Sequence, residues 1–469
     1  MLLESIATAV GLIFVGVVSL VLFALHQQNK NGAKHADVET LKNLNVPQNS
    51  LFRIFQPHLV SLEEAKSKGF GAALSIVQIL IGVQPTTNMV LNIWNPAYEC
   101  YNLFVPNFLN IPELLLPGND TLRHLVPLAG FVVSRANQCG YCSVHSCSLA
   151  IRRGCDASVL QNAMDLVLNE KGGPTALLTT AAERAVARVA HGLGTVPASL
   201  TKGDCEALYQ HLTTSEVEWI VAVTAMFGAF NKYMEALALP LERDSYTESM
   251  HHMDNAFSLS DIISGDCVNE PAKGAELPKP SVDDWTVQVA VLYHGLKPGG
   301  ALAVDKKLRQ GVPSKADECI AYLRQKTGVA FSVLGKLQHS RLCRALTAIV
   351  EKNMVSDGIS LHTKLLAGIE YCKVLGNDQL RTELEDVVEY LKQSERAHAE
   401  SEDLASTELA LRAAKAMSFT KSQMTKELVD EIEGSNLKPA DLVEIVSFLA
   451  MTQALHRIEV FFMVAGQSE

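Results

Sequence analysis

Two cysteines and a histidine stand close together in the first half of the chain, as Cys139, Cys142 and His145. On a helix, residues three apart share one face, so both thiols and the imidazole would point to the same side. Asn137 is a favourable N-cap and Gly154 a favourable C′ residue, which predicts a single helix between them. Both thiols then lie near its first turn, where free backbone N–H groups and the helix dipole favour a thiolate.

Helix position alone gives a thiol only a modest gain in reactivity. Lowering a thiol pKa from about 8.5 to about 6.5 raises the thiolate fraction at neutral pH to about three quarters. The weaker base loses roughly tenfold in intrinsic nucleophilicity, because the Brønsted β is about 0.4–0.5. A neighbouring base and a second thiol must supply the rest of the rate. His145 and Cys139 are spaced to do so.

Other kinds of site compete for this motif. A Cys/Cys/His zinc site needs a fourth ligand, for which Cys147 or Cys155 is available, but no second paired motif exists. A c-type haem attachment needs a histidine directly after the second cysteine, where this chain has Ser143. Cysteines also serve as small core residues. The favoured interpretation is a redox dithiol that uses no metal and no cofactor.

Composition limits the classes of protein that the chain can belong to. It has 469 residues, of which 48% are hydrophobic and 19% charged, enough for two to three globular domains. The net charge of −11 and the lack of any Lys/Arg cluster argue against nucleic acid as a partner. Ten cysteines without framework spacing favour a reducing compartment.

Residues 6–25 form a nearly unbroken apolar run, about the length that crosses a bilayer as a helix. Glu4 precedes the run and no Lys or Arg does, unlike a secretory signal peptide. Lys30 and Lys34 follow it, which by the positive-inside rule puts the globular part in the cytosol. The sequence therefore predicts a single-pass membrane protein.

The remainder shows helical periodicity without strand alternation, so the predicted class is all-α. The stretch between the two halves is polar and rich in proline, which marks a boundary. The expected organisation is an N-terminal transmembrane anchor at 1–26, a polar tether at 27–45, a redox-active unit at 46–243, a linker at 244–284 and a second unit at 285–469.

The second unit weakly repeats the first. Residues 437–446 align with residues 212–221, and ordered matches continue at an offset of 224 or 225. At the position of the dithiol, His362 can be aligned with His145, but both cysteines are missing. The pattern predicts a duplicated chain with a degenerate second unit. The packing of this unit on the first, as an internal pseudo-dimer, is an expectation that comes from the family resemblance described next.

The Cys-Gly-Tyr-Cys-Ser-Val-His motif, reached by an apolar helix and followed by a helix ending at Gly154, resembles the alkyl hydroperoxidase D-like branch of the carboxymuconolactone decarboxylase superfamily. The resemblance is good over residues 120–240 and faint over 285–465. It includes Glu183-Arg184-Ala185, the Leu200-Thr201-Lys202 turn, and the helix from Ser215 to Met234.

The resemblance implies an all-helical bundle that forms dimers or higher oligomers. It also implies a thiol peroxidase or disulfide oxidoreductase that needs no cofactor and is regenerated by an unidentified thiol or dithiol donor. One thiolate attacks the peroxide, becomes a sulfenic acid and condenses with its partner. Carried over, Cys142 attacks beside His145 and Cys139 resolves. Helix position alone leaves the order open, because Cys139 is nearer the N-terminus.

Two departures from the family pattern favour an alternative function. Relatives usually carry a glutamate on the helix before the motif, where this chain offers Asp120, His124 and Arg135. Many relatives also place the histidine one residue later, where this chain has Ser146. The alternative is a non-catalytic scaffold or interaction protein on the same fold, with a vestigial dithiol.

Overall fold

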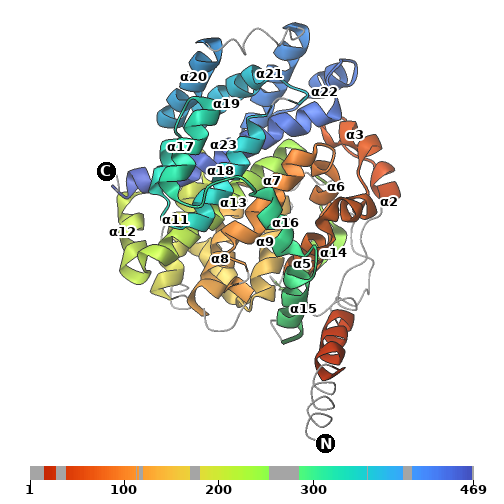
Figure 1. The fold of residues 1–469 in the computed structure, drawn as a ribbon, viewed down its shortest axis with the longest axis vertical. Helices are drawn as coiled ribbons and strands as arrows, with labels where there is room; N and C mark the ends of the chain where they lie inside the picture. Colours follow the sequence, from red (N-terminus) through yellow and green to blue (C-terminus); the bar gives the residue numbers. More distant parts are fainter. Residues whose placement is uncertain are drawn as a thin grey trace, which may run out of the picture.

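The computed structural model describes residues 15–27, 38–111, 113–115, 120–168, 180–252, 285–355, 357–393 and 404–466. Across these ranges every regular element is a helix and no strand occurs, which confirms the all-α prediction. Figure 1 shows the helices gathered into one body, from which the N-terminal helix Val15–Gln27 projects.

The first half contributes the helices that carry the motif and surround it. The chain order is α2 (Val38–Lys42), α3 (Phe52–Phe55), α4 (Leu62–Ala65), α5 (Gly71–Ile81), α6 (Thr87–Leu91), α7 (Asn95–Phe108), α8 (Asp120–Ala136), α9 (Gly140–Arg152), α10 (Ala157–Leu168), α11 (Ala181–Gly194), α12 (Lys202–His211), α13 (Thr214–Ala236) and α14 (Arg243–His252).

The second half also consists of helices in its described residues. Its order is α15 (Trp285–Leu296), α16 (Ala301–Leu308), α17 (Ala316–Thr327), α18 (Ser340–Asn353), α19 (Leu361–Leu375), α20 (Asp378–Gln393), α21 (Leu404–Ser418), α22 (Lys426–Glu433) and α23 (Pro439–Val464).

Helix caps recur at the spacing of the predicted repeat. Thr201 caps α12 and Thr425 caps α22 through the side-chain hydroxyl. The N–H groups of Thr213 and Lys438, which precede α13 and α23, each donate at 2.8 Å to a carboxylate three residues later. Such reciprocal contacts satisfy N–H groups that a helix start leaves unpaired. The two halves therefore share local start signals at an offset of 224 or 225.

Helices α13 and α23 pack against each other in the centre of the molecule (Figure 1). Gly228 permits the close approach, since a Cβ there would lie 2.7 Å from Nε of Arg457. The Arg457 guanidinium is fully buried and donates a 3.0 Å hydrogen bond to the carbonyl oxygen of Thr224. The two halves thus share one core.

The described helix that is long and apolar enough to span a membrane is α23, not the N-terminal segment. Its most apolar 18-residue window is 100% buried inside the protein, so core packing accounts for its composition. The sequence placed the spanning helix at residues 6–25, ahead of the bundle. Only the shorter apolar helix Val15–Gln27 is described there, and residues 6–14 lie outside the described ranges.

The predicted linker 244–284 begins inside a helix. α14 packs on α9, where Ser249 Oγ donates at 3.1 Å to the carbonyl oxygen of Val144. Arg152 and Glu248 form a buried ion pair at 2.7 Å between the same two helices. The rest of the predicted linker, residues 253–284, lies outside the described ranges. Helix α14 therefore fixes the chain that leads out of the first unit against the motif helix.

Candidate functional site

The dithiol helix α9 starts directly after a tight turn. Gln138 adopts a left-handed conformation with φ 57°, which reverses the chain after α8. The Cys139 N–H then donates at 3.1 Å to the carbonyl oxygen of Ser134, closing the end of α8. Left-handed residues of this kind commonly end a helix. The turn therefore sets where α9 begins.

Cys139, rather than Asn137, is the N-cap of α9, so that detail of the sequence prediction is wrong. The Cys139 Sγ accepts a 3.2 Å hydrogen bond from the N–H of Cys142. Asn137 instead donates at 3.1 Å to the carbonyl oxygen of Gly194. Using the thiol as a cap places both sulfurs at the first turn, and their side chains interact there.

Both thiols are free and buried, with exposed fractions of 0% for Cys139 and 3% for Cys142. Burial raises the pKa of the Cys139 thiol well above its ordinary value, and the contact with Cys142 adds to the effect. Burial also raises the pKa of the Cys142 thiol, although the contact with Cys139 partly offsets it. The expected acidic thiol is wrong, because desolvation outweighs the helix N-terminus.

His145 is paired with Glu242, a residue that the sequence analysis did not single out. The imidazole Nε2 lies 2.9 Å from Oε2 of Glu242, and both side chains are about nine-tenths buried. Nδ1 lies 2.9 Å from the carbonyl oxygen of Tyr141. Since a carbonyl only accepts, Nδ1 carries a proton and Nε2 faces the carboxylate. His145 is therefore oriented by two oxygen partners.

The Glu242 carboxylate is held from several sides. Oε1 accepts from the Tyr141 hydroxyl at 2.8 Å and from the N–H of Thr86. Burial would raise the pKa of Glu242, but the charge of His145 and these hydrogen bonds leave the pKa below its ordinary value. Glu242 is thus a carboxylate at neutral pH. It can stabilise a positive charge on the imidazole.

Glu242 gave no local signal in the sequence. It follows α13 in a non-helical stretch and lies 101 positions after Tyr141. The family pattern predicts the acid on the helix before the motif, and that helix lacks a glutamate. In this fold the carboxylate that pairs with His145 comes from Glu242, near the C-terminal end of the predicted unit 46–243.

A second acid lies beside Cys139. Glu235, near the end of α13, interacts with the Cys139 thiol and with the N–H of Gly140. Burial raises the pKa of Glu235 to about 7, against the opposing effects of that thiol and of Lys232. Burial lowers the pKa of Lys232 to about 7. Glu235 acts on both thiols, because its charge raises the pKa of Cys142 as well as that of Cys139.

A cavity of about 60 Å³ lies beside Cys142 and His145. Cys142, His145 and Tyr141 line it together with apolar side chains, while Cys139 is not part of its lining. A small reactant in the cavity would therefore meet Cys142 first.

The residues considered for zinc do not assemble. In the part of the chain that the structure describes, no three His, Cys, Asp or Glu side chains gather as a metal site requires. Cys155 instead directs its Sγ at the carbonyl oxygen of His124, 3.3 Å away, and Cys147 is fully buried.

The second half has a hydroxyl pair where the first has the thiol pair. Ser360 caps α19 and accepts from the N–H of Thr363 at 3.1 Å, just as Cys139 accepts from Cys142. In this register Leu366 corresponds to His145, and His362 lies one residue before Thr363. The alignment of His362 with His145 is therefore out of helical register.

No family model, curated protein or solved structure matches the chain. The resemblance to the alkyl hydroperoxidase D-like proteins stays a prediction from the motif.

Proposed function

We propose that this chain is a thiol-dependent peroxidase or disulfide oxidoreductase that works through Cys139, Cys142 and His145. One observation carries the proposal: the free Cys142 thiol, which interacts with the free Cys139 thiol, lines a cavity that is also lined by a carboxylate-paired imidazole. A structural pair of cysteines needs neither the cavity nor the paired imidazole.

The first step is attack of the Cys142 sulfur on the distal oxygen of a hydroperoxide. The O–O bond breaks, Cys142 becomes a sulfenic acid, and the peroxide leaves as an alcohol or water. The thiol must lose a proton, and the leaving oxygen must gain one. His145, which is paired with Glu242, borders the same cavity and exchanges both protons. Such exchange compensates for a thiol whose pKa is raised by burial.

The second step closes the disulfide. The Cys139 sulfur attacks the sulfenic sulfur of Cys142, an S–S bond forms, and hydroxide leaves as water. Glu235 interacts with the Cys139 thiol and is placed to accept its proton. An external thiol or dithiol then reduces the disulfide and restores both thiols. This order agrees with the cavity, whose lining includes Cys142 alone of the pair.

The fold belongs to the same proposal. We assign the chain to an alkyl hydroperoxidase D-like bundle, duplicated within one polypeptide, whose second unit acts as an intrachain pseudo-dimer partner. The shared order of α8–α13 and α18–α23, the caps at a constant offset, and the packing of α13 on α23 support this assignment. Self-association of the whole chain is a further expectation.

We also propose a single-pass anchor at residues 6–25 with the globular part in the cytosol. The described part of this segment is an apolar helix whose Val15, Leu20 and Leu22 side chains are exposed. Exposed side chains of this kind favour a lipid environment.

A specific observation also favours the alternative, a scaffold with a vestigial dithiol. Both thiols are buried and their pKa values are raised, as expected of structural cysteines.

Peroxide consumption by the full chain, with dithiothreitol as reductant, separates the two functions. The proposal expects turnover that Cys142→Ser abolishes and that Cys147→Ser, a buried cysteine of the same helix, retains. Equal consumption by the wild type and Cys142→Ser would instead support the scaffold.

A further inference from the structure

A second apolar cavity lies directly beyond the cavity of the dithiol. It has a volume of about 100 Å³ and lies among α5, α7, α15 and α16. Its lining is aliphatic apart from Asn102. Val77 and Val105 line both cavities, so the outer cavity adjoins the space that Cys142 borders at these two side chains.

The outer cavity reaches the surface through exposed leucines. Leu292 and Leu296 on α15 and Leu302 on α16 line it, and their exposed fractions are 38%, 69% and 41%. Large aliphatic side chains exposed together at a cavity mouth mark a site for an apolar ligand or surface.

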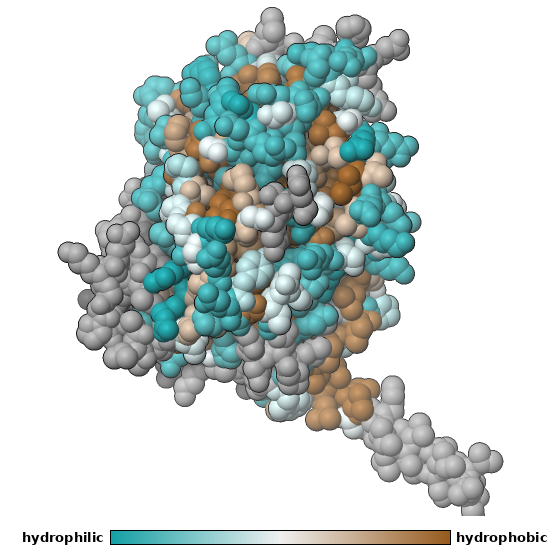
Figure 2. Space-filling view, turned by 90° about the vertical axis from the view of Figure 1, so that its left-hand side faces the viewer, coloured by the Kyte–Doolittle hydropathy of each residue, from teal (hydrophilic) through white to brown (hydrophobic). Residues whose placement is uncertain are grey.

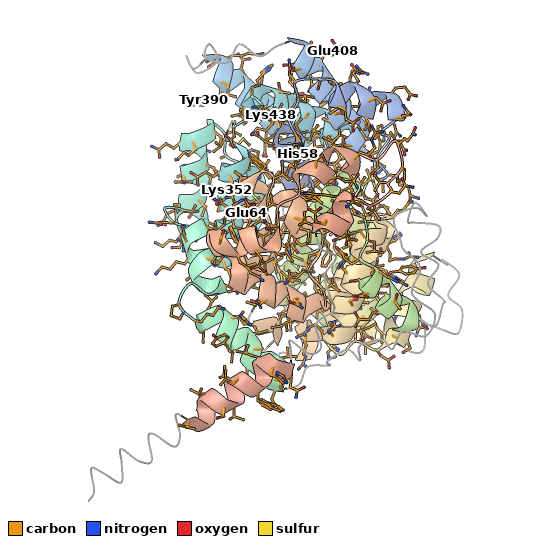
Figure 3. All side chains as sticks on the ribbon, turned by 90° about the vertical axis from the view of Figure 1, so that its right-hand side faces the viewer. His58, Glu64, Lys352, Tyr390, Glu408 and Lys438 are labelled. Carbon is orange, nitrogen blue, oxygen red and sulfur yellow. The ribbon has the colours of Figure 1, made fainter. Side chains whose placement is uncertain are left out.

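Helix α15, which lines the mouth, also contacts the N-terminal helix, whose residues 15–25 belong to the proposed anchor. Phe23 of the N-terminal helix stacks on Trp285 at the start of α15, with ring centroids 5.9 Å apart. Figure 2 shows apolar surface continuing from the body onto that helix, and Figure 3 shows the helix beside α15. If residues 6–25 lie in a bilayer, the leucines at the mouth are held close to its surface.

We propose that these two cavities form a passage for the hydroperoxylated acyl chain of a membrane lipid, which enters from the bilayer and reaches Cys142. The inference rests on the proposed function and gives it a substrate class. A dry cavity of about 150 Å³ takes up benzene. The two adjoining cavities, of about 60 Å³ and about 100 Å³, together reach that volume and hold a short run of methylene groups. Cys142, His145 and Tyr141 line the inner cavity, where the hydroperoxyl group would bind.

Filling the junction tests the passage. In vesicle-reconstituted full chain, we compare Val77→Phe with the matched Val374→Phe, a half-buried valine of α19 outside both cavity linings. The reactants are hydrogen peroxide, free hydroperoxylinoleic acid, and phosphatidylcholine carrying a hydroperoxylated chain. We expect Val77→Phe to slow reduction of both lipid hydroperoxides about tenfold or more while hydrogen peroxide reduction persists, since the larger ring narrows the junction for an acyl chain more than for a small molecule.

A mouth variant covers the case in which Val77→Phe fails to fold. Leu296→Asp alters an exposed residue, and Met463→Asp is its control on the equally exposed end of α23. We expect only Leu296→Asp to slow reduction of the phosphatidylcholine hydroperoxide. A smaller effect of Leu296→Asp on the reduction of free hydroperoxylinoleic acid would show that the lipid substrate enters from the bilayer. Equal loss with all three reactants, or no loss in either variant, would overturn the passage.

A binding readout separates this inference from the proposed function. Cys142→Ser is irradiated with a diazirine-bearing fatty acid, and the labelled peptides are identified by mass spectrometry. We expect labels on α7, α15 and α16 that Val77→Phe reduces on α7, even if the wild type consumes no peroxide. Labels confined to the N-terminal helix would contradict the passage while leaving peroxide consumption untouched.

Discussion

Helices α9 and α19 begin with the same geometry but with different atoms. In α9 the sulfur of Cys139 caps the N–H of Cys142, and in α19 the oxygen of Ser360 caps the N–H of Thr363. Hydroxyl oxygen is the better cap, and serine and threonine are preferred at that position. Capping therefore does not explain the sulfurs of α9.

The surroundings of the two helices differ as well. His145 with its Glu242 partner and a cavity lie beside the thiols, whereas Leu366 occupies the matching position of α19. The residue after Thr363 is Lys364, which forms a fully buried ion pair with Glu444 at 2.6 Å. One half thus gathers thiols, an imidazole and a carboxylate beside a cavity, and the other has a buried ion pair at the matching place.

The largest expected effect comes from replacing the Cys139 and Cys142 thiols of α9 with the hydroxyl side chains that α19 has at the matching positions. The double change Cys139→Ser with Cys142→Thr should reduce peroxide consumption to background, because neither sulfur of the proposed reactive pair remains to be oxidised. The cap survives, so the free energy of unfolding should change by no more than about 1 kcal/mol. Urea unfolding and peroxide consumption check both statements. Residual turnover would show that the thiols are not the reactive groups.

The paired carboxylate is the next distinction between the halves. Glu242→Gln keeps an acceptor for Tyr141 and Thr86 but removes the charge beside His145. We expect the rate of peroxide consumption to fall about 100-fold, the lower end of general acid–base contributions. Tyr141→Phe, which removes one hydrogen bond to the same carboxylate, should cost less. Unchanged turnover in Glu242→Gln would remove His145 from the mechanism.

Burial of the thiols gives a third test. Because burial raises the pKa of Cys142, its alkylation by iodoacetamide should keep rising by about tenfold per pH unit from pH 7 to 9. Alkylation in the urea-unfolded chain should be faster at neutral pH. Mass spectrometry of the Cys142 peptide follows both reactions. A plateau below pH 7 would mean an acidic thiol after all.

Glu235 distinguishes α13 from α23, where Val460 stands at the matching position. Its pKa is about 7 in the folded chain and 4.5 ordinarily, so it favours folding below about pH 4.5 and loses that contribution as pH rises through 7. Glu235→Gln stays neutral, so its stability relative to wild type should grow from pH 5 to pH 8, by on the order of 1–3 kcal/mol. Urea titrations measure this.

Glu206→Gln, an exposed change on α12, is the control for that experiment. Between pH 5 and pH 8, the free energy of unfolding of this variant should change as much as that of the wild type does. A parallel response of both variants would mean that Glu235 titrates normally.

The smallest expected effect comes from placing two cysteines at the start of α19. Ser360→Cys with Thr363→Cys, made in the chain that carries Cys139→Ser and Cys142→Thr, should restore no measurable peroxide consumption. Sulfur alone is insufficient there, because Leu366 stands where α9 has its histidine. Restored turnover would show that any capped dithiol suffices and that the comparison of surroundings is wrong.

The sequence predicted the helical class and the helix that carries the dithiol, because periodicity and spacing are local properties. It misassigned the cap to Asn137, since a thiol is rarely expected to serve as an acceptor there. It also predicted an acidic thiol, because burial by distant helices leaves no mark near Cys142. Local patterns report the helix but not its solvation.

Two acids of the site were beyond the reach of sequence reasoning. Glu242 contacts His145 only because the chain after α13 returns to α9, and Glu235 meets Cys139 because α13 itself packs on α9. Likewise, the apolar composition of α23 could not be distinguished from that of a membrane helix until its partners were known. Long-range packing decided all three.

The most direct test of the central claim is the bond that forms when the full chain meets one equivalent of hydrogen peroxide. Tryptic mapping without reductant should find Cys139 and Cys142 joined in one peptide that is two hydrogens lighter. Cys142→Ser should show no such loss. Two free thiols after the reaction, or a Cys142 sulfinic acid with Cys139 still reduced, would contradict the account.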